Sequence, residues 1–176
     1  MHEHNERRAA QKLVELLAAG KSVALVSDAG TPAVSDPGAL AVAAVREAGY
    51  PVVALPGANA ALCALAAAGL DAPHFLFYGF LPAQAAARRQ ALDALKALPF
   101  LLVFYEAPHR IAACIEDLAA VFGAARGVTI GRELTKLFET VHRTTLGEAG
   151  AWLAADDNRR RGEFVLLVDG ATADAS

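Results

Sequence analysis

Ser27-Asp28-Ala29-Gly30-Thr31-Pro32-Ala33-Val34-Ser35-Asp36-Pro37-Gly38 is the segment from which the rest of the sequence is best interpreted. It follows the apolar run Ser22–Val26, which predicts a short buried strand, and it precedes a helix expected to begin with Asp36 as its cap and to end at Gly49. Ligands bind at the carboxyl ends of strands in open α/β sheets. Glycine lets a ligand approach the backbone, and proline fixes the path of the chain. The segment is therefore predicted to be a ligand-binding loop, with Asp28 or Asp36 accepting hydrogen bonds from hydroxyl or ammonium groups.

A second loop of the same kind is Pro56-Gly57-Ala58-Asn59-Ala60, which follows the predicted buried strand Val52–Leu55. Amides at the start of the alanine-rich helix, which Asn59 would cap and which ends at Gly69, are suited to a polar ligand. A plain capped helix start explains this loop equally well. The G-x-G-x-x-G and P-loop patterns are absent from the sequence, which weakens dinucleotide and triphosphate interpretations.

Helical and strand patterns alternate along the whole chain. Asn5 is predicted to cap a first helix with the apolar face Leu13, Leu16 and Leu17, which Gly20 ends. Further strands are expected over 75–78, 100–105, 128–130, 140–144 and 163–168, and further helices over 85–97, 111–122 and 146–155. Apolar strands separated by helices indicate largely parallel sheets covered on both faces. The expected organisation is two small α/β domains, 1–72 and 73–170, with a tail over 171–176.

Composition is typical of a globular chain with a sizeable core. The 176 residues are 55% hydrophobic, and the formal net charge is −3. Residues 1–72 carry five Lys and Arg against seven Asp and Glu, so any contact with RNA must come from a local patch. The polar start is not a signal peptide, and the apolar run 56–70 is shorter than the roughly 20 residues that span a bilayer. A cytoplasmic protein without a membrane span is expected.

Several side chains are of types that take part in metal or redox chemistry. Cys63 and Cys114 are interpreted as free thiols in apolar helices. His2 and His4 have the spacing of a metal pair but lie at a terminus, and no metal site is predicted. The basic run 159–161 is interpreted as a solvated turn that could also contact RNA.

Two polar segments follow predicted buried strands. Phe104-Tyr105-Glu106-Ala107-Pro108-His109-Arg110 brings together an acid, an imidazole and a guanidinium, and Gly131-Arg132-Glu133-Leu134-Thr135-Lys136 brings together an acid and two bases. Polar groups at strand ends are candidates for substrate contact or proton transfer. Buried Arg–Glu pairs that hold two loops together are an equally good explanation.

Taken in order, these loops, together with Phe77-Tyr78-Gly79-Phe80-Leu81-Pro82 and Gly162-Glu163-Phe164-Val165-Leu166, resemble the tetrapyrrole (corrin/porphyrin) methylase superfamily, in its ribosomal RNA branch. The resemblance runs from about residue 2 to 170. It implies two α/β domains with a cofactor cleft between them and a homodimer. It also implies 2′-O-methylation of a cytidine in small-subunit ribosomal RNA or the 30S subunit, with S-adenosylmethionine as donor and S-adenosylhomocysteine as product.

The same resemblance implies roles for individual residues. Donor contacts are expected at Asp28, Ala29, Gly30, Val34, Asn59, Ala60, Phe80 and Leu81. RNA or catalytic roles are expected at Glu106, Arg132, Glu133 and Lys136, with Glu133 or Glu106 as a weak general base and Lys136 lowering the pKa of the attacking hydroxyl.

The chain departs from the family pattern at its start. Members of the family begin with a strand and a Gly-Asn-Leu-x-Asp-x-Thr loop, whereas this chain starts with Met-His-Glu-His-Asn, inside that pattern. The first domain is therefore expected to lack its N-terminal strands, to keep much of the fold, and to bind the donor weakly or not at all. Two alternatives are a methyltransferase acting on a tetrapyrrole and a non-catalytic fragment that binds RNA or protein.

Overall fold

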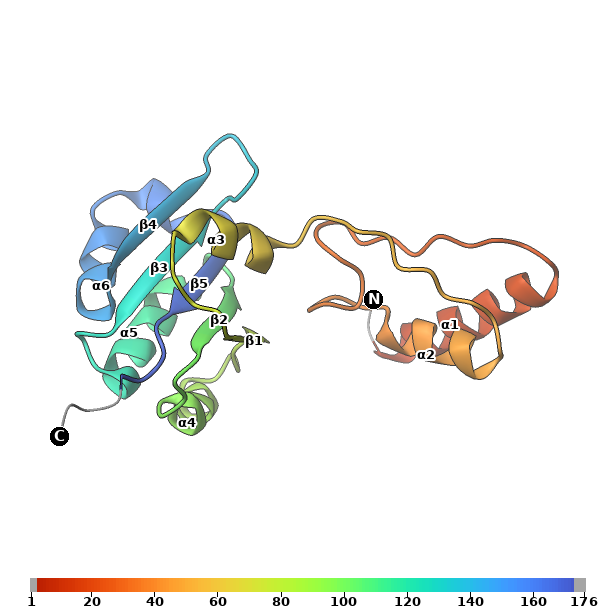
Figure 1. The fold of residues 1–176 in the computed structure, drawn as a ribbon, viewed down its shortest axis with the longest axis horizontal. Helices are drawn as coiled ribbons and strands as arrows, with labels where there is room; N and C mark the ends of the chain where they lie inside the picture. The colour runs from red at the N-terminus through yellow and green to blue at the C-terminus, as the bar shows by residue number, and fades with distance from the viewer. Residues whose placement is uncertain (1–2, 173–176) are drawn as a thin grey trace. The chain divides into compact units, whose positions relative to one another are not determined.

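The computed structural model describes residues 3–172, with side chains from residue 6 onward, and divides into two compact units (Figure 1). The first unit is Met1–Asn59 and the second is Ala60–Ser176. The alanine-rich helix belongs to the second unit because it packs on the sheet there. The sequence-based division after residue 72 stays a prediction. Residues 173–176 of the predicted tail lie outside the described residues.

The first unit is built on two helices that pack against each other, α1 (Glu3–Ala18) and α2 (Ala39–Glu47). Ala10, Ala41 and Val45 are buried, whereas the predicted apolar face of α1 is half-buried. Both predicted caps are wrong. Asn5 lies inside α1, and α2 begins after Gly38 and not after Asp36. The capping residue has a φ of 138°, a conformation that glycine adopts readily and aspartate does not.

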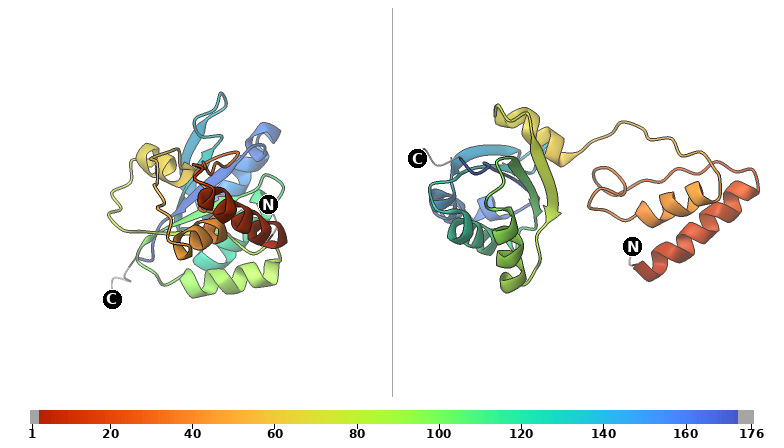
Figure 2. Two further views of the ribbon diagram at one scale, coloured as in Figure 1. Left: turned by 90° about the vertical axis from the view of Figure 1, so that its right-hand side faces the viewer. Right: turned by 60° about the horizontal axis from the view of Figure 1, so that its bottom comes forward.

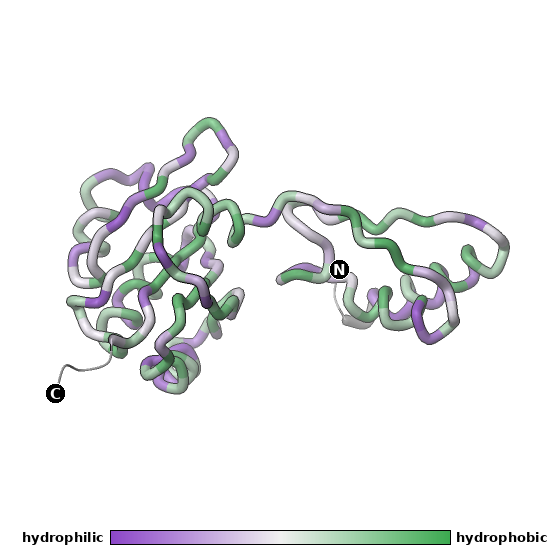
Figure 3. The backbone as a smooth tube through the Cα atoms, in the orientation of Figure 1, coloured by the Kyte–Doolittle hydropathy of each residue, from purple (hydrophilic) through white to green (hydrophobic). Residues whose placement is uncertain are grey.

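The two strands predicted in the first unit do not form. Ser22–Val26 and Val52–Leu55 are extended, but neither is hydrogen-bonded into a sheet within the described residues. Val26, Val53 and Leu55 are 81%, 79% and 83% exposed. Figure 3 shows how hydrophobic these extended segments are. An apolar pattern predicts a strand correctly only where a neighbouring strand is present to take up its backbone hydrogen bonds.

The second unit contains a five-stranded sheet in the order β1-β2-β5-β3-β4. Figure 2 shows the ribbon from two further directions. Its elements in chain order are α3 (Ala60–Ala68), β1 (Phe75–Phe80), α4 (Ala85–Leu95), β2 (Leu101–Glu106), α5 (Ile111–Phe122), β3 (Gly127–Arg132), β4 (Thr140–Thr145), α6 (Leu146–Ala154), the 3-10 helix η1 (Asp157–Arg160) and β5 (Phe164–Val168). The helices and strands predicted after residue 59 are all present, with shifted ends.

The expectation of a largely parallel sheet is wrong for the second unit. Only β1 and β2 pair in parallel, whereas β5 pairs antiparallel with both β2 and β3, and β4 pairs antiparallel with β3. Strands β1, β2 and β3 do run in one direction, as their helical connections require. The final strand β5 enters between β2 and β3 from the opposite direction. Sequence order does not reveal that insertion.

Helices cover both faces of the sheet, as predicted. On one face, α4, α5 and α6 pack against alternate residues such as Leu102, Phe104 and Leu166, which are fully buried. On the other face, α3 packs its small residues against Val103, Leu167 and their neighbours. The alternation within each central strand places successive side chains in the two cores.

Helices α4 and α5 are also joined by a buried ion pair. Asp117 accepts from Arg88 at 2.6 Å and from Arg89 at 2.5 Å, and the side chains of Asp117 and Arg88 are almost fully buried. Hydrogen bonds from the two guanidinium groups outweigh burial and hold the pKa of Asp117 below its ordinary value. In the part of the chain that the structure describes, no helix combines the length and the apolar character needed to cross a membrane.

Candidate functional site

The loop over residues 27–38 has a strained backbone. Gly30 and Gly38 have positive φ, and so do two residues with side chains, Ala33 at 66° and Ser35 at 57°. Left-handed conformations of non-glycine residues cost free energy and are concentrated at ligand-binding sites. At Gly30 an added Cβ would meet no atom within 4 Å, so the backbone there is open to an approaching group. The predicted contacts Asp28 and Ala29 are exposed, and Val34 is half-buried.

This loop lies against the second predicted loop. The Thr31 hydroxyl donates to the carbonyl oxygen of Ala58 at 2.9 Å, and the Ser27 hydroxyl donates to that of Gly30 at 3.1 Å. The structure therefore brings residues 27–38 next to residues 56–59 inside the first unit. Two loops that follow apolar extended segments therefore meet there.

The end of the loop is held by α1. The Glu6 carboxylate is buried, and its Oε1 accepts from the amides of Gly38 at 2.7 Å and Leu40 at 3.3 Å. These amides belong to the first turn of α2 and have no helical acceptor of their own. Sequence reasoning missed Glu6 because it lies 32 residues before Gly38, and no local pattern reports such a contact.

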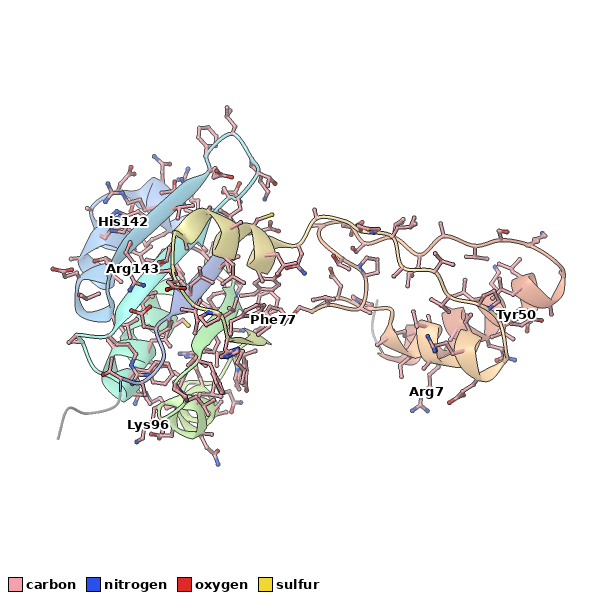
Figure 4. The ribbon with its side chains drawn as sticks, in the orientation of Figure 1. Arg7, Tyr50, Phe77, Lys96, His142 and Arg143 are labelled. Carbon is pink, nitrogen blue, oxygen red and sulfur yellow. The ribbon has the colours of Figure 1, made fainter. Side chains whose placement is uncertain are left out.

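In the second unit, the start of α3 is fixed by Tyr105 on β2. The Tyr105 hydroxyl accepts from the Ala61 amide at 3.1 Å, and its ring meets those of Phe80 and Phe77 edge-on. Phe77 is labelled in Figure 4. Ala60 and Asn59 lie directly before this anchor and are half-buried. Sequence reasoning gave Tyr105 no role, although it stands in a quoted motif.

The predicted residues Phe80 and Leu81 differ in exposure. Phe80 is 50% exposed at the end of β1, whereas Leu81 is 2% exposed and belongs to the core. The carbonyl oxygen of Leu81 accepts from Arg110 at 2.6 Å. Phe80 is therefore open to a ligand, whereas Leu81 is held by the core and by Arg110.

Glu106 forms a buried ion pair at the end of β2. Its side chain has no exposed surface, and its Oε1 lies 3.0 Å from Nε of Arg110 and accepts from the Ala107 amide at 2.8 Å. Arg110 continues to the carbonyl oxygens of Leu81 and Pro82. The pair thus joins the turn after β2 to the turn after β1. A catalytic role for Glu106 stays a prediction.

Glu133 and Lys136 lie together in the connection between β3 and β4. Lys136 Nζ lies 3.0 Å from Oε1 of Glu133 and 2.9 Å from Oε2 of Glu163, and the Glu163 amide donates to the same Glu133 oxygen at 2.8 Å. Glu133 has a φ of 50° and packs so closely on Gly162 that any side chain at residue 162 would collide with it. Local contacts thus hold the acid and the base in one geometry.

This arrangement sets the charge on both groups. The Glu163 amide and the Lys136 ammonium lower the pKa of Glu133, so its carboxylate is ionised at neutral pH. The two carboxylates raise the pKa of Lys136, which therefore stays protonated. The Lys136 ammonium and the Glu163 amide both donate to Oε1 of Glu133. The cluster offers a carboxylate oxygen and a partly exposed ammonium side by side.

Arg132 ends β3 beside this cluster. Its guanidinium donates to the carbonyl oxygens of Arg161 at 3.2 Å and Phe138 at 3.0 Å and to the Thr140 hydroxyl at 3.3 Å. Among the described residues its buried Nε has no hydrogen-bond partner. Phe164 of β5 pairs with Glu106 of β2 on one side and with Arg132 of β3 on the other. All three residues therefore lie at the same end of the three central strands.

Other candidates for chemistry lie elsewhere. Cys114 is buried, which raises the pKa of its thiol, and Cys63 is half-buried; both are free. The side chain of His4 and all of His2 lie outside what the structure describes. Among described residues, no group of three His, Cys, Asp or Glu side chains is placed to hold a metal ion.

Comparison with known proteins identifies the family. Residues 1–150 match the model of the Tetrapyrrole (Corrin/Porphyrin) Methylases. The chain is 50% identical over 173 residues to "Ribosomal RNA small subunit methyltransferase I" of Escherichia coli O157:H7, covering 98% of this chain and 60% of that protein. It is 45% identical to the protein of the same name from Bacillus subtilis strain 168, covering 97% of this chain and 57% of that protein. The chain thus spans about 60% of the length of these relatives.

Solved structures agree with this assignment at the level of the fold. The methyltransferase CobJ matches with a TM-score of 0.69 at 24% identity, covering 92% of this chain and 70% of that one. Uroporphyrin-III C-methyl transferase from Thermus thermophilus, in complex with S-adenyl homocysteine, matches with a TM-score of 0.59 at 17% identity, covering 92% and 73%. Sequence, family model and fold lead to one conclusion: the chain belongs to the tetrapyrrole (corrin/porphyrin) methylase family.

Proposed function

We propose that this chain is part of a methyltransferase that uses S-adenosylmethionine to methylate small-subunit ribosomal RNA at the 2′-hydroxyl of a cytidine. The observation that carries the proposal is the 50% identity, over 98% of the chain, to a protein named as a ribosomal RNA small subunit methyltransferase. The proposal includes a homodimer and the 30S subunit as partners, and hence a reaction in the cytoplasm.

The first unit supports donor binding through the two loops joined by Thr31. Asp28, Ala29, Gly30 and Val34 are assigned to donor contacts there. Exposed backbone at Gly30 suits close approach of a ligand, and the exposed Asp28 carboxylate suits ribose hydroxyls or the ammonium group of the donor. When bound, S-adenosylmethionine supplies an electrophilic methyl group and leaves as S-adenosylhomocysteine.

Asn59, the last residue of the first unit, is also assigned to donor contacts. In the second unit, Ala60 at the start of α3, Phe80 at the end of β1 and Leu81 directly after it are assigned to donor contacts. Tyr105 supports this assignment because it contacts both groups, through the Ala61 amide and the Phe80 ring. The exposed Phe80 ring offers an apolar surface, and Leu81 is buried in the core.

Glu133 and Lys136 are assigned to the attacking hydroxyl. The Lys136 ammonium would stabilise negative charge that develops on the ribose oxygen, and the Glu133 carboxylate would accept its proton. The lowered pKa makes Glu133 a weak base, which is adequate where correct positioning of the two reactants supplies most of the acceleration. Arg132 is assigned to the RNA, and Glu106 to the support of the neighbouring turns as well as its predicted catalytic role.

Methyl transfer from radiolabelled donor to isolated small-subunit ribosomal RNA tests the reaction. A uroporphyrinogen-type tetrapyrrole in a parallel tube tests the alternative acceptor. Label at a ribose oxygen of one cytidine, located by primer extension at low nucleotide concentration, would support the proposal. Label only on the tetrapyrrole would refute it.

The residue assignments have their own test. In the full-length protein that contains this chain, Glu133→Gln and Lys136→Ala should each lower kcat at least tenfold while leaving the Kd for S-adenosylhomocysteine unchanged. Asp28→Ala should weaken that Kd without altering RNA binding. Glu116→Gln, an exposed position on α5, serves as the matched control. Full kcat in both of the first two variants would show that neither group assists the transfer.

A further inference from the structure

The connection between β3 and β4 carries an apolar tip that the assignments above leave unused. Leu137 is 90% exposed and Phe138 is 67% exposed, more than any other large apolar side chain of the second unit. The connection reaches beyond the ends of its two strands (Figure 1). Loop tips are ordinarily polar, and neighbouring exposed apolar side chains indicate a contact surface.

This tip is held rigidly outward. Glu139 Oε2 accepts from the Thr135 amide at 2.5 Å, and the carbonyl oxygens of Glu133 and Lys136 accept from amides within the loop. Leu134 anchors the loop on the α3 face of the sheet. With the backbone so constrained, Leu137 and Phe138 cannot turn inward to the core. A rigid apolar surface binds at lower entropic cost than a mobile one.

Two cations flank this surface without a carboxylate partner. Within residues 3–172, neither Arg132 nor Arg161 forms an ion pair, although the carbonyl oxygen of Phe138 accepts directly from Arg132. The nearby carboxylates are already engaged: Glu133 and Glu163 share Lys136, and Glu139 holds the Thr135 amide. Unlike the Lys136 ammonium, the two guanidinium groups are therefore not engaged with a carboxylate, which suits contacts with phosphate groups.

We propose that Phe138, with Leu137 beside it, stacks on an unpaired nucleobase of the RNA, while Arg161 and Arg132 face the adjoining phosphates. Aromatic rings next to guanidinium groups are the combination by which proteins bind unpaired nucleotides. This inference rests on the proposed function for its partner and places the acceptor strand beside Glu133 and Lys136. A second copy of the chain is the competing occupant, and two uncompensated guanidinium groups disfavour it.

Binding of the whole chain to fluorescent small-subunit ribosomal RNA fragments tests the inference. Phe138→Ala should raise the Kd about tenfold, Phe138→Tyr should keep it, and Phe138→Leu should behave like alanine because stacking needs a ring. Arg161→Ala should flatten the slope of log K against log salt by about 0.7 to 0.9. Phe75→Ala, which removes a 43% exposed ring at the opposite edge of the sheet, is the control. Circular dichroism checks that each variant is folded.

Each outcome decides the question. Equal affinity of Phe138→Ala and the unchanged chain overturns the inference, as does failure of the unchanged chain to bind RNA. If Phe138→Leu retains its affinity for RNA and sedimentation shows that this variant has lost a dimer, the inference is overturned. The apolar tip would then bind a second copy of the chain. If Phe138→Ala weakens RNA binding but the full-length protein that contains this chain transfers no methyl group to RNA, the inference stands and the proposed function fails.

Discussion

The two units of this molecule follow the same alternation of helix and apolar segment, yet within residues 3–172 only the second contains a sheet. In the second unit, Val103 and Leu166 are fully buried in strands that pair on both sides. In the first unit, Val53 and Leu55 have the same apolar character and are about four-fifths exposed. An apolar extended segment therefore forms a strand only where a neighbouring strand accepts and donates its backbone hydrogen bonds.

The units also differ in what stabilises them. Two hydrophobic clusters and the Arg88–Asp117 pair stabilise the second unit. In the first, single side chains bind backbone groups: Glu6 at the start of α2 and Thr31 at Ala58. Packing stabilises a unit through many small contacts, whereas such hydrogen bonds act locally. Five predictions sharpen this difference.

The largest effect is expected from the core of the second unit. Phe104→Ala removes a fully buried ring and should lower the free energy of unfolding by about 3–5 kcal/mol in urea titrations followed by circular dichroism. Val53→Ala, in the first unit, should change it by less than about 0.5 kcal/mol. A cost above about 2 kcal/mol for Val53→Ala would show that this segment is buried in solution.

The buried ion pair should come next. Asp117→Ala leaves Arg88 buried without its partner and should cost about 3 kcal/mol, whereas Asp93→Ala in the exposed pair with Lys96 should cost under about 1 kcal/mol.

Acid should act through the same group. The folded pKa of Asp117 lies below its ordinary value of 3.8, so its stabilising contribution is present above about pH 4 and is lost as pH falls through the folded pKa. Unfolding curves recorded between about pH 5 and about pH 2, the range in which carboxylates titrate, measure this loss of stability. Equal acid sensitivity in the Asp117→Ala chain would contradict it.

A smaller, local effect is expected in the first unit. Glu6→Ala removes the acceptor for the Gly38 and Leu40 amides and should cost about 1–2 kcal/mol of local stability. Hydrogen exchange of the Leu40 amide should then become about 5 to 30 times faster, while Glu15→Ala on the same helix should leave it unchanged. Unaltered exchange in Glu6→Ala would show that the carboxylate does not hold the loop.

The smallest effect is spectroscopic. His142 stacks on Trp152, the single tryptophan, with ring centroids 4.3 Å apart. Burial, and secondarily Arg159, lower the pKa of His142 below its ordinary value of 6.5. The imidazolium form of His142 quenches Trp152, so the tryptophan fluorescence should fall as the pH is lowered, with a midpoint below 6.5. The stability that the neutral imidazole contributes should be lost as pH falls through the same midpoint. His142→Phe should remove the transition, and a midpoint at or above 6.5 would contradict the burial.

Much of the second unit was predictable because its signals are local. Gly69 and Gly123 end helices with positive φ, and continuous apolar runs mark β2 and β5. Strand order was not predictable, because the entry of β5 between β2 and β3 depends on packing between segments far apart in the chain. The capping of α2 by Glu6 was hidden for the same reason.

The loop over residues 27–38 shows where sequence and tertiary structure each decide. Its glycines, prolines and aspartates, read locally, indicate a ligand loop, and sequence alone also determines the family. Only the tertiary structure decided that Thr31 joins this loop to Ala58, that Glu163 and Lys136 hold Glu133, and that Glu106 is fully buried. Local conformation follows from neighbouring residues, whereas burial, charge state and contact depend on groups that folding brings from elsewhere in the chain.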